Sequence, residues 1–257
     1  MQNELTLPVG TLLGFALVLA RISGVFVFVP FPTQNAGPVP ARIALALATA
    51  MALFPHWPSV DPQAFQLGTM VLWMISELAL GTCIGLMVSF VSEALTFGAQ
   101  ALSLQAGYGY ASVVDPTTQA DSNVLPAMAQ LMAGLLFFTT GLHRYVIGVF
   151  ARSLDAYPPG NFTLPKEMLG ALLRLGSSIF TVGLRLALPV IALLLMTDIA
   201  LALIGRINSQ LQLGIHAFPA KMLLTLFLLS IVLLAAPNLF NAYAGEVVRS
   251  LRGLLLR

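Results

Sequence analysis

The feature that most constrains this chain is a series of long runs with almost no charged residue. Hydrophobic residues make up 58% of the sequence and charged residues only 9%, whereas soluble domains carry about 25% charged residues. In a lipid bilayer the backbone must satisfy its own hydrogen bonds, and a helix does this within one segment. The sequence therefore predicts an all-α integral membrane protein. No polar linker divides residues 1–257, so we expect a single membrane-embedded unit.

About six hydrophobic helical segments can be distinguished. They cover residues 12–29, 43–54, 67–90 with a less apolar continuation to 106, 124–142 or to 150, 179–204 with an amphipathic lead-in from 167, and 222–236. The second has only twelve residues, fewer than the roughly 20 needed to span a bilayer. Such a short segment indicates either a helix packed against partner proteins or an imprecise boundary. No basic residue precedes Arg21, unlike in a signal peptide, so we expect the first segment to remain as a helix.

Charged residues inside the apolar segments are candidates for function, because such residues usually face protein or a water-filled cavity. There are five: Arg21, Glu77, Arg174, Arg185 and Asp198. Arg174 and Arg185 share a polar stripe with Ser178 and Thr181. Arg185 is a possible partner of Glu77 or of Glu93. Arg21 and Asp198 have no evident partner in the sequence.

A second stripe follows the third segment at intervals of four residues. It consists of Glu77, Gly81, Gly85, Ser89 and Glu93. Residues at this spacing lie along one side of a helix, and small residues there allow a second helix to approach closely. Two interpretations stay open. The stripe is either a proton or substrate path lined by two carboxylates, or a tight helix contact whose acids pair with basic residues.

Residues 107–123 form a polar, glycine-rich stretch between two apolar segments. It is too polar to face lipid and too long for a tight turn, and loops of this length are often functional. An ordinary solvent-exposed loop is the alternative. The basic residues Arg249, Arg252 and Arg257 close the chain, which favours a cytoplasmic C-terminus by the positive-inside rule. With six crossings the N-terminus would also be cytoplasmic.

Several classes of function are disfavoured. The chain has none of the common hydrolase, metalloprotease or phosphate-loop motifs, so we do not expect an enzyme. Its three histidines are far apart in sequence, and no metal or other cofactor is expected. The net charge of +2 predicts no nucleic-acid partner.

Three stretches resemble the FliR/SctT family of flagellar and injectisome export proteins. The first runs from Arg21-Ile22-Ser23-Gly24 through Pro30 to Pro40-Ala41-Arg42. The second is Gln105-Ala106-Gly107-Tyr108-Gly109-Tyr110-Ala111, followed by Val114-Asp115-Pro116. The third combines Arg206 and Gln210 with Phe218-Pro219 and Lys221. The third match is partial, because Ser209, Gln212 and Ala217 replace the family's usual proline, asparagine and glycine.

The resemblance implies a role in type III protein export, in the bacterial inner membrane within a flagellar basal body or injectisome base. It implies FliP-like and FliQ-like subunits as partners in a channel for unfolded export substrates. It further implies a FliP-like front, residues 1–166, and a FliQ-like hairpin with a basic tail, residues 167–257.

The resemblance also assigns local roles. The implied channel plug comprises Gly107, Tyr108, Gly109, Tyr110, Ala111, Val113, Val114, Asp115 and Pro116. The helix-packing or polar-path candidates come from the charges and the stripe described above, with Gly24 added from the first motif. They are Arg21, Gly24, Glu77, Gly81, Gly85, Glu93, Arg174, Arg185 and Asp198. Arg206, Gln210, Pro219 and Lys221 would form a cytoplasmic-side loop that meets an FlhB-type switch protein. The rival hypothesis is a small-molecule transporter or channel, which should show repeated halves with interrupted helices; the sequence has no convincing internal repeat.

Overall fold

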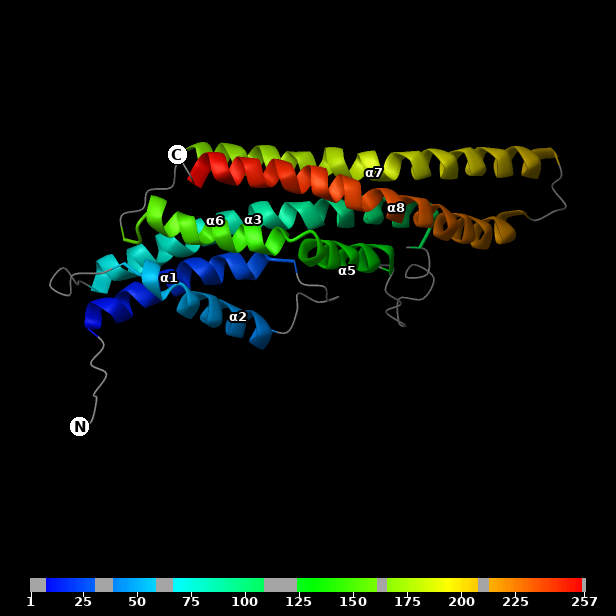
Figure 1. Ribbon diagram of the computed structural model, residues 1–257. Helices are drawn as coiled ribbons and strands as arrows, with labels where there is room; N and C mark the ends of the chain where they lie inside the picture. The colour runs from blue at the N-terminus through cyan, green and yellow to red at the C-terminus, as the bar shows by residue number, and fades with distance from the viewer. Residues whose placement is uncertain are drawn as a thin grey trace.

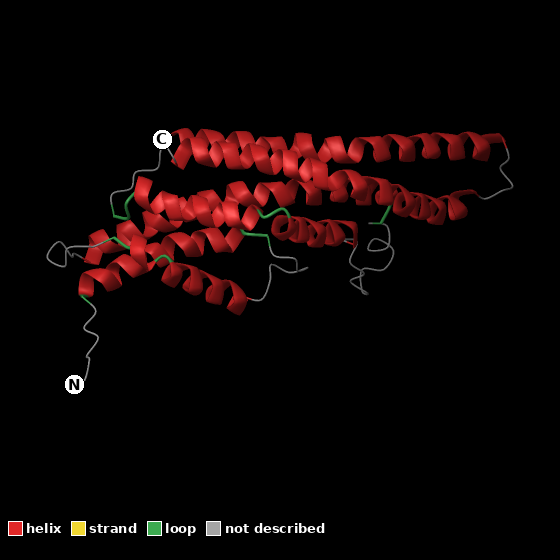
Figure 2. Cartoon of the chain, in the orientation of Figure 1, coloured by secondary structure: helices red, strands yellow, loops and turns green. Residues whose placement is uncertain are grey.

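A computed structural model describes residues 8–30, 39–58, 67–108, 124–160, 166–207 and 213–255. Within these ranges the regular structure is entirely helical (Figure 2). The helices are α1 (Val9–Phe28), α2 (Val39–Ala52), η1 (Phe54–His56), α3 (Leu67–Ala106), α5 (Val124–Thr139), α6 (Leu142–Ala156), α7 (Lys166–Ile207) and α8 (Leu213–Leu255). The prediction of an all-α membrane protein is confirmed.

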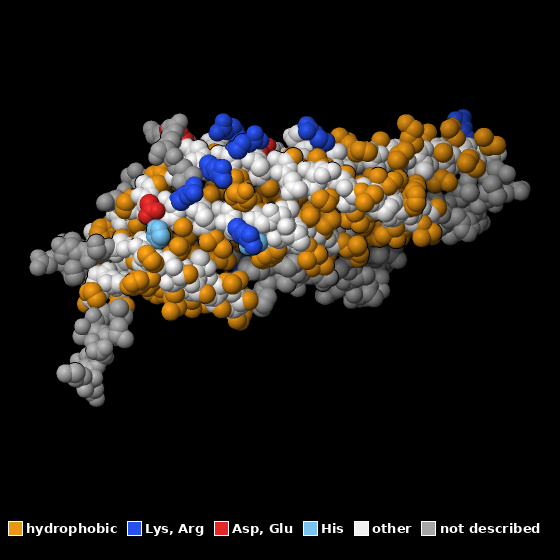
Figure 3. Space-filling view, viewed as in Figure 1, with side chains coloured by type: hydrophobic (Ala, Val, Ile, Leu, Met, Phe, Trp, Pro, Cys, Tyr) orange, Lys and Arg blue, Asp and Glu red, His pale blue; other side chains and the backbone are white. Residues whose placement is uncertain are grey.

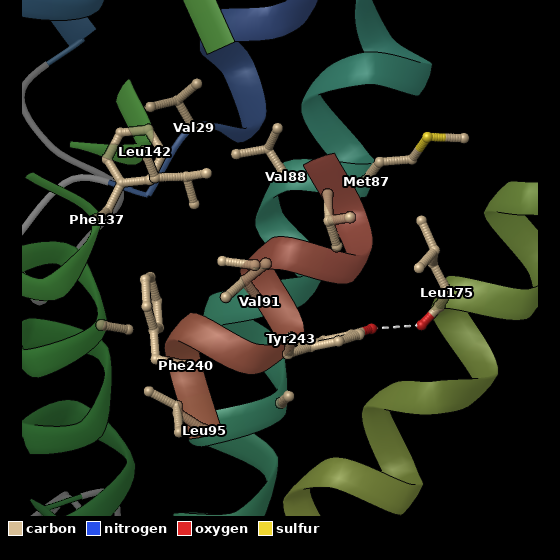
Figure 4. Packing of buried hydrophobic residues seen from close by; sticks show 14 of the residues in the cluster. Val29, Met87, Val88, Val91, Leu95, Phe137, Leu142, Leu175, Phe240 and Tyr243 are labelled. Atoms are coloured by element: carbon tan, nitrogen blue, oxygen red, sulfur yellow. Dashed lines mark hydrogen bonds between the residues drawn. The ribbon is translucent and has the colours of Figure 1, made fainter. Parts of the chain in front are cut away.

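Helix α3 is the centre of the arrangement. It contacts α1, α5, α7 and α8, and Figure 1 shows α1 and α2 on one side of it and the long α7–α8 pair on the other. Val91 and Leu95 of α3 pack in one buried cluster with Phe240 and Tyr243 of α8 (Figure 4). The Tyr243 hydroxyl donates a 2.6 Å hydrogen bond to the Leu175 carbonyl oxygen and so ties α8 to α7.

The fourth apolar segment forms two helices instead of one. Helices α5 and α6 meet at an angle of 66°. Gly141 lies at the bend with φ +74°, a left-handed conformation that glycine adopts without steric cost. The glycine and the polar residues after it therefore end α5 and start α6 in a new direction.

The six predicted segments all form helices, but in the described part of the chain fewer than six are candidate membrane spans. Four helices are long and apolar enough to span a membrane, or five if the bent α5–α6 pair counts as one span. Helix α2 has 14 residues and is too short. Four spans would keep the N-terminus on the same side as the C-terminus, as inferred for six crossings, whereas five would place the two ends on opposite sides.

The last segment is longer than its apolar core predicted. Helix α8 continues through Pro219 and Pro237 and includes the basic tail as far as Leu255. Proline is tolerated inside membrane helices because neighbouring helices satisfy the freed backbone groups. At 1.5 Å per residue, α3, α7 and α8 are each about 60 Å long, twice the thickness of a hydrocarbon core.

Candidate functional site

The first polar cluster is built around Arg21, which lies in the middle of α1. Its Nε donates a 2.5 Å hydrogen bond to a carboxylate oxygen of Glu77 in α3, and both side chains are 0% exposed. A buried charge is tolerated only when it is paired and hydrogen-bonded. Arg21 is therefore neutralised by Glu77, and the expectation that Arg21 lacks a partner in the chain is wrong. Of the two possible partners considered for Arg185, Glu77 is paired with Arg21 instead.

The remaining donors of Arg21 bind the end of α6. Its Nη1 and Nη2 each lie 2.8 Å from a carbonyl oxygen, that of Ser153 and that of Tyr157 respectively. The last carbonyls of a helix have no partner within the helix, and the negative end of its dipole attracts a cation. Arg21 thus caps α6 while it pairs with α3.

Glu77 completes the cluster through its second oxygen, which accepts the backbone N–H of Gly160 at 3.2 Å. Gly160 has φ +98°, a conformation that favours glycine. The Tyr157 hydroxyl donates to the Leu254 carbonyl oxygen at 2.9 Å. One ion pair therefore connects α1, α3, the end of α6 and the turn after it, and Tyr157 extends the connection to α8.

Glycines allow α1 and α3 to approach closely beside this ion pair. A Cβ added at Gly24 would lie 2.6 Å from the Leu78 carbonyl oxygen, and one at Gly85 would lie 2.7 Å from that of Val25. A Cβ at Gly81 would overlap the Arg21 carbonyl oxygen. Of the two interpretations of the stripe, the contacts of Glu77, Gly81 and Gly85 therefore match the tight helix contact with a paired acid.

The other end of the stripe is different. Glu93 is exposed on α3, and Arg174 and Arg185 are exposed on α7. The structure does not bring these three side chains into the Arg21–Glu77 cluster. They face outward from the single chain, where lipid or a partner subunit would lie.

Sequence reasoning missed a second close contact, between α3 and α7. A Cβ at Gly98 would lie 2.8 Å from the Gly183 carbonyl oxygen, and one at Gly183 would lie 2.7 Å from that of Ala94. The signal was present, because Ala94 and Gly98 are small residues four positions apart on one helix.

A second polar cluster joins α3 to the α7–α8 hairpin. The Lys221 ammonium lies 2.8 Å from an oxygen of Asp198, and the Gln105 amide donates to the same carboxylate at 3.3 Å. Asp198 is thus compensated within the chain, contrary to expectation. Lys221 and Pro219 lie inside α8, and the connection to α7 is shorter than predicted because α8 begins at Leu213.

The start of the expected plug adjoins this cluster. The Tyr108 N–H bonds the Ser103 carbonyl and the Gly107 N–H bonds the Leu104 carbonyl, and Gly107 has φ +84°. This paired pattern with a left-handed glycine ends a helix sharply. The Tyr108 hydroxyl lies 3.5 Å from the Met222 carbonyl oxygen. The other plug residues, Gly109 to Pro116, and Gln210 lie outside the described residues, and Arg206 is exposed near the end of α7.

No metal-binding constellation exists in the described part of the chain, where no three His, Cys, Asp or Glu side chains are close enough to hold an ion. The two clusters instead connect helices. This geometry defines the class: an all-helical membrane protein whose helices are joined by one buried ion pair, one partly exposed ion pair and close glycine contacts.

Comparison with known proteins identifies the family. The profile of the family described as "Bacterial export proteins, family 1" matches residues 12–247, and the chain belongs to this family. It is 29% identical to the flagellar biosynthetic protein FliR of Escherichia coli, over 85% of this chain and 84% of the relative. It is 28% identical to FliR of Pectobacterium carotovorum, over 94% and 90% of the two chains. It is also 24% identical to the surface presentation of antigens protein SpaR of Salmonella typhimurium, over 77% and 74%.

Proposed function

We propose that this chain is a structural subunit of a type III export gate in the bacterial inner membrane. With FliP-like and FliQ-like subunits it would form the channel for unfolded export substrates, in a flagellar basal body or an injectisome base. The match to the export family over residues 12–247 carries the proposal. The relatives include proteins named for flagellar biosynthesis and a protein named for surface presentation of antigens, so the proposal covers both kinds of export apparatus.

The surface of the long hairpin supports assembly with other subunits. Helix α7 is strongly apolar, yet only 17% of its hydrophobic window is buried within the chain. The exposed apolar side chains extend along the whole helix and include Leu169, Leu173, Leu188, Leu203 and Ile207. Because α7 is about twice as long as a bilayer is thick, lipid alone cannot cover this surface. Partner helices would cover the remainder.

The proposed division of the chain follows the same hairpin. Residues 167–257, which contain almost all of α7 and α8, would be the FliQ-like part, and residues 1–166 the FliP-like part. The connection near Arg206 would meet an FlhB-type switch protein on the cytoplasmic side. Helices α7 and α8 are antiparallel neighbours of nearly equal length (Figure 1), as a hairpin requires.

Purification tests the proposal directly. Expressed alone, the chain is expected to be polydisperse in detergent, because the apolar surface beyond the bilayer stays uncovered. Co-expressed with FliP-like and FliQ-like subunits, it is expected to elute as one complex whose mass contains all three. The measurements are size-exclusion chromatography with light scattering, followed by mass spectrometry. A stable, monodisperse single chain that binds neither partner would contradict the proposal.

A second test concerns residues 107–123 as the channel plug. Glycines permit a sharp backbone path, Asp115 before Pro116 disfavours helix, and Tyr108 and Tyr110 offer bulk with a polar end. A plug must yield to substrate and so should be weakly held. Replacing residues 110–122 by a short Gly-Ser linker is expected to leave assembly intact and to make cells permeable to ions and small dyes.

Conductance and dye entry are the readouts for the linker variant. A strain without the chain is the control, because it has no assembled channel and its membrane should stay impermeable to ions and dyes. If the assembled linker variant is no more permeable than the parent, another subunit closes the channel.

A further inference from the structure

A hollow of about 420 Å³ lies between α6 and α8 at the bend after α5. Three arginines line it: Arg144 and Arg152 of α6 and Arg252 of α8. No acidic side chain is among its lining residues in the described part of the chain. Figure 3 shows a group of Lys and Arg side chains on this end of the molecule, beside a broad hydrophobic surface. The hollow is therefore a concentrated positive site at the edge of an apolar face.

The spacing on α6 builds the hollow. Arg144, Gly148 and Arg152 are four residues apart and lie along one side of the helix. Gly148 leaves the floor open, since a Cβ added there would meet nothing within 4 Å. The Arg252 guanidinium lies 5.7 Å from the centre of the Tyr145 ring, and this cation–π contact orients it in advance.

Three arginines around one hollow fit a phosphate group. The planar guanidinium offers paired N–H donors that match phosphate oxygens and bind them more selectively than a lysine ammonium does. Arg144 and Arg152 are exposed and make no ion pair with an acid among the described residues. Their donors are available to a ligand.

The position along α8 favours a lipid as the source of the phosphate. Residues 222–245 of α8 contain no charged residue and extend about 36 Å, slightly more than the thickness of a hydrocarbon core. Glu246 ends this run, and Arg249 and Arg252 follow it at the level where a headgroup layer would lie. Elsewhere on α5 and α6, Leu135 and Ile147 are 58% and 42% exposed and offer apolar surface for acyl chains. Tyr145 has the amphipathic ring that is common at membrane interfaces.

We propose that this hollow, the arginine pocket of Arg144, Arg152 and Arg252, binds the phosphate headgroup of an anionic phospholipid. The acyl chains lie against the exposed apolar side of α5 and α6. Basic pockets between membrane helices recognise anionic headgroups in this way. The site fixes the α6–α8 end of the chain at one membrane surface, and it does not depend on which partners the chain assembles with.

Native mass spectrometry tests the proposal on the full chain, together with any subunits that co-purify with it. The assembly is titrated with phosphatidylglycerol, with phosphatidylcholine of the same acyl chains, and with inorganic phosphate. The parent is expected to retain phosphatidylglycerol roughly tenfold better than phosphatidylcholine, because each arginine near the headgroup adds to the attraction. The variant R144Q/R152Q/R252Q is expected to lose this preference. The matched control R174Q/R185Q/R206Q removes the same charge from exposed positions of α7 and is expected to keep it.

A second variant separates a shaped pocket from general positive charge. Gly148→Leu fills the floor of the arginine pocket without changing any charge, and its Cβ would meet nothing within 4 Å. It is expected to lower phosphatidylglycerol retention nearly to the level of phosphatidylcholine. Unchanged retention in Gly148→Leu, or equal loss in the α7 control, would overturn the proposal in favour of diffuse electrostatics.

Two further outcomes would also overturn it. Displacement of the lipid by millimolar inorganic phosphate, with phosphate retained on the assembly, would assign the pocket to a free anion. Loss of a co-purifying subunit from R144Q/R152Q/R252Q, with lipid retention unchanged, would assign it to an acidic protein partner.

Discussion

Replacing Arg21 with methionine is expected to destabilise the protein by about 3–5 kcal/mol, the usual cost of removing one member of a buried ion pair. The Glu77 carboxylate would keep only the Gly160 N–H as a partner, and it would remain buried without its cation. The Tyr157 carbonyl oxygen at the end of α6 would also lose its Arg21 donor, and the Ser153 carbonyl oxygen would lose one of its two donors while keeping the Tyr157 N–H. The measurement is the thermal unfolding of the purified assembly, together with the amount of protein in the membrane.

Two comparisons make the Arg21 prediction specific. Arg185→Met removes a similar side chain from an exposed position of α7 and is expected to have little effect on stability. The double variant R21M/E77M removes the unpaired charge and should recover part of the loss, because two apolar groups can replace a buried ion pair. An Arg21→Met protein as stable as Arg185→Met would contradict the role assigned to the ion pair.

Replacing Gly81 with leucine is expected to separate α1 from α3 and to prevent assembly. Even the Cβ of alanine would overlap the Arg21 carbonyl oxygen, and backbone atoms in a packed helix pair cannot move aside as a flexible side chain can. Overfilling a packed interior costs about 1–3 kcal/mol, and alanine is expected to reach at least the lower part of this range. The larger leucine should abolish the complex. Co-purification of the partner subunits is the measurement.

Gly68→Leu is the matched control for Gly81→Leu. Gly68 lies on the same helix, and a Cβ there would meet nothing within 4 Å, so this variant is expected to assemble normally. Normal complex formation by Gly81→Leu with export lost would point instead to a path along α3, the alternative interpretation of the Glu77-to-Glu93 stripe.

The sequence alone predicted the helical membrane class and most of the segments. In lipid, a single segment can satisfy its backbone N–H and C=O groups only by forming a helix, so long apolar runs predict helices directly. Local signals were equally direct. Gly107, which opens the predicted glycine-rich stretch, adopts positive φ at the end of α3, because glycine alone enters that conformation freely. Gly141 does the same before α6, at a bend that was not predicted from the sequence.

The tertiary structure decided which distant residues meet. Arg21 and Arg185 are chemically equivalent candidates for Glu77, and nothing in their spacing separates them. The choice of Arg21 follows from the glycine contact that brings α1 against α3, together with the end of α6, whose carbonyls need a donor. Asp198 likewise finds Lys221 only because α7 and α8 fold back on each other. Helix formation depends on interactions within a few residues, whereas ion pairing depends on how whole helices pack. The sequence therefore determined the helices, and only the packed structure determined their partners.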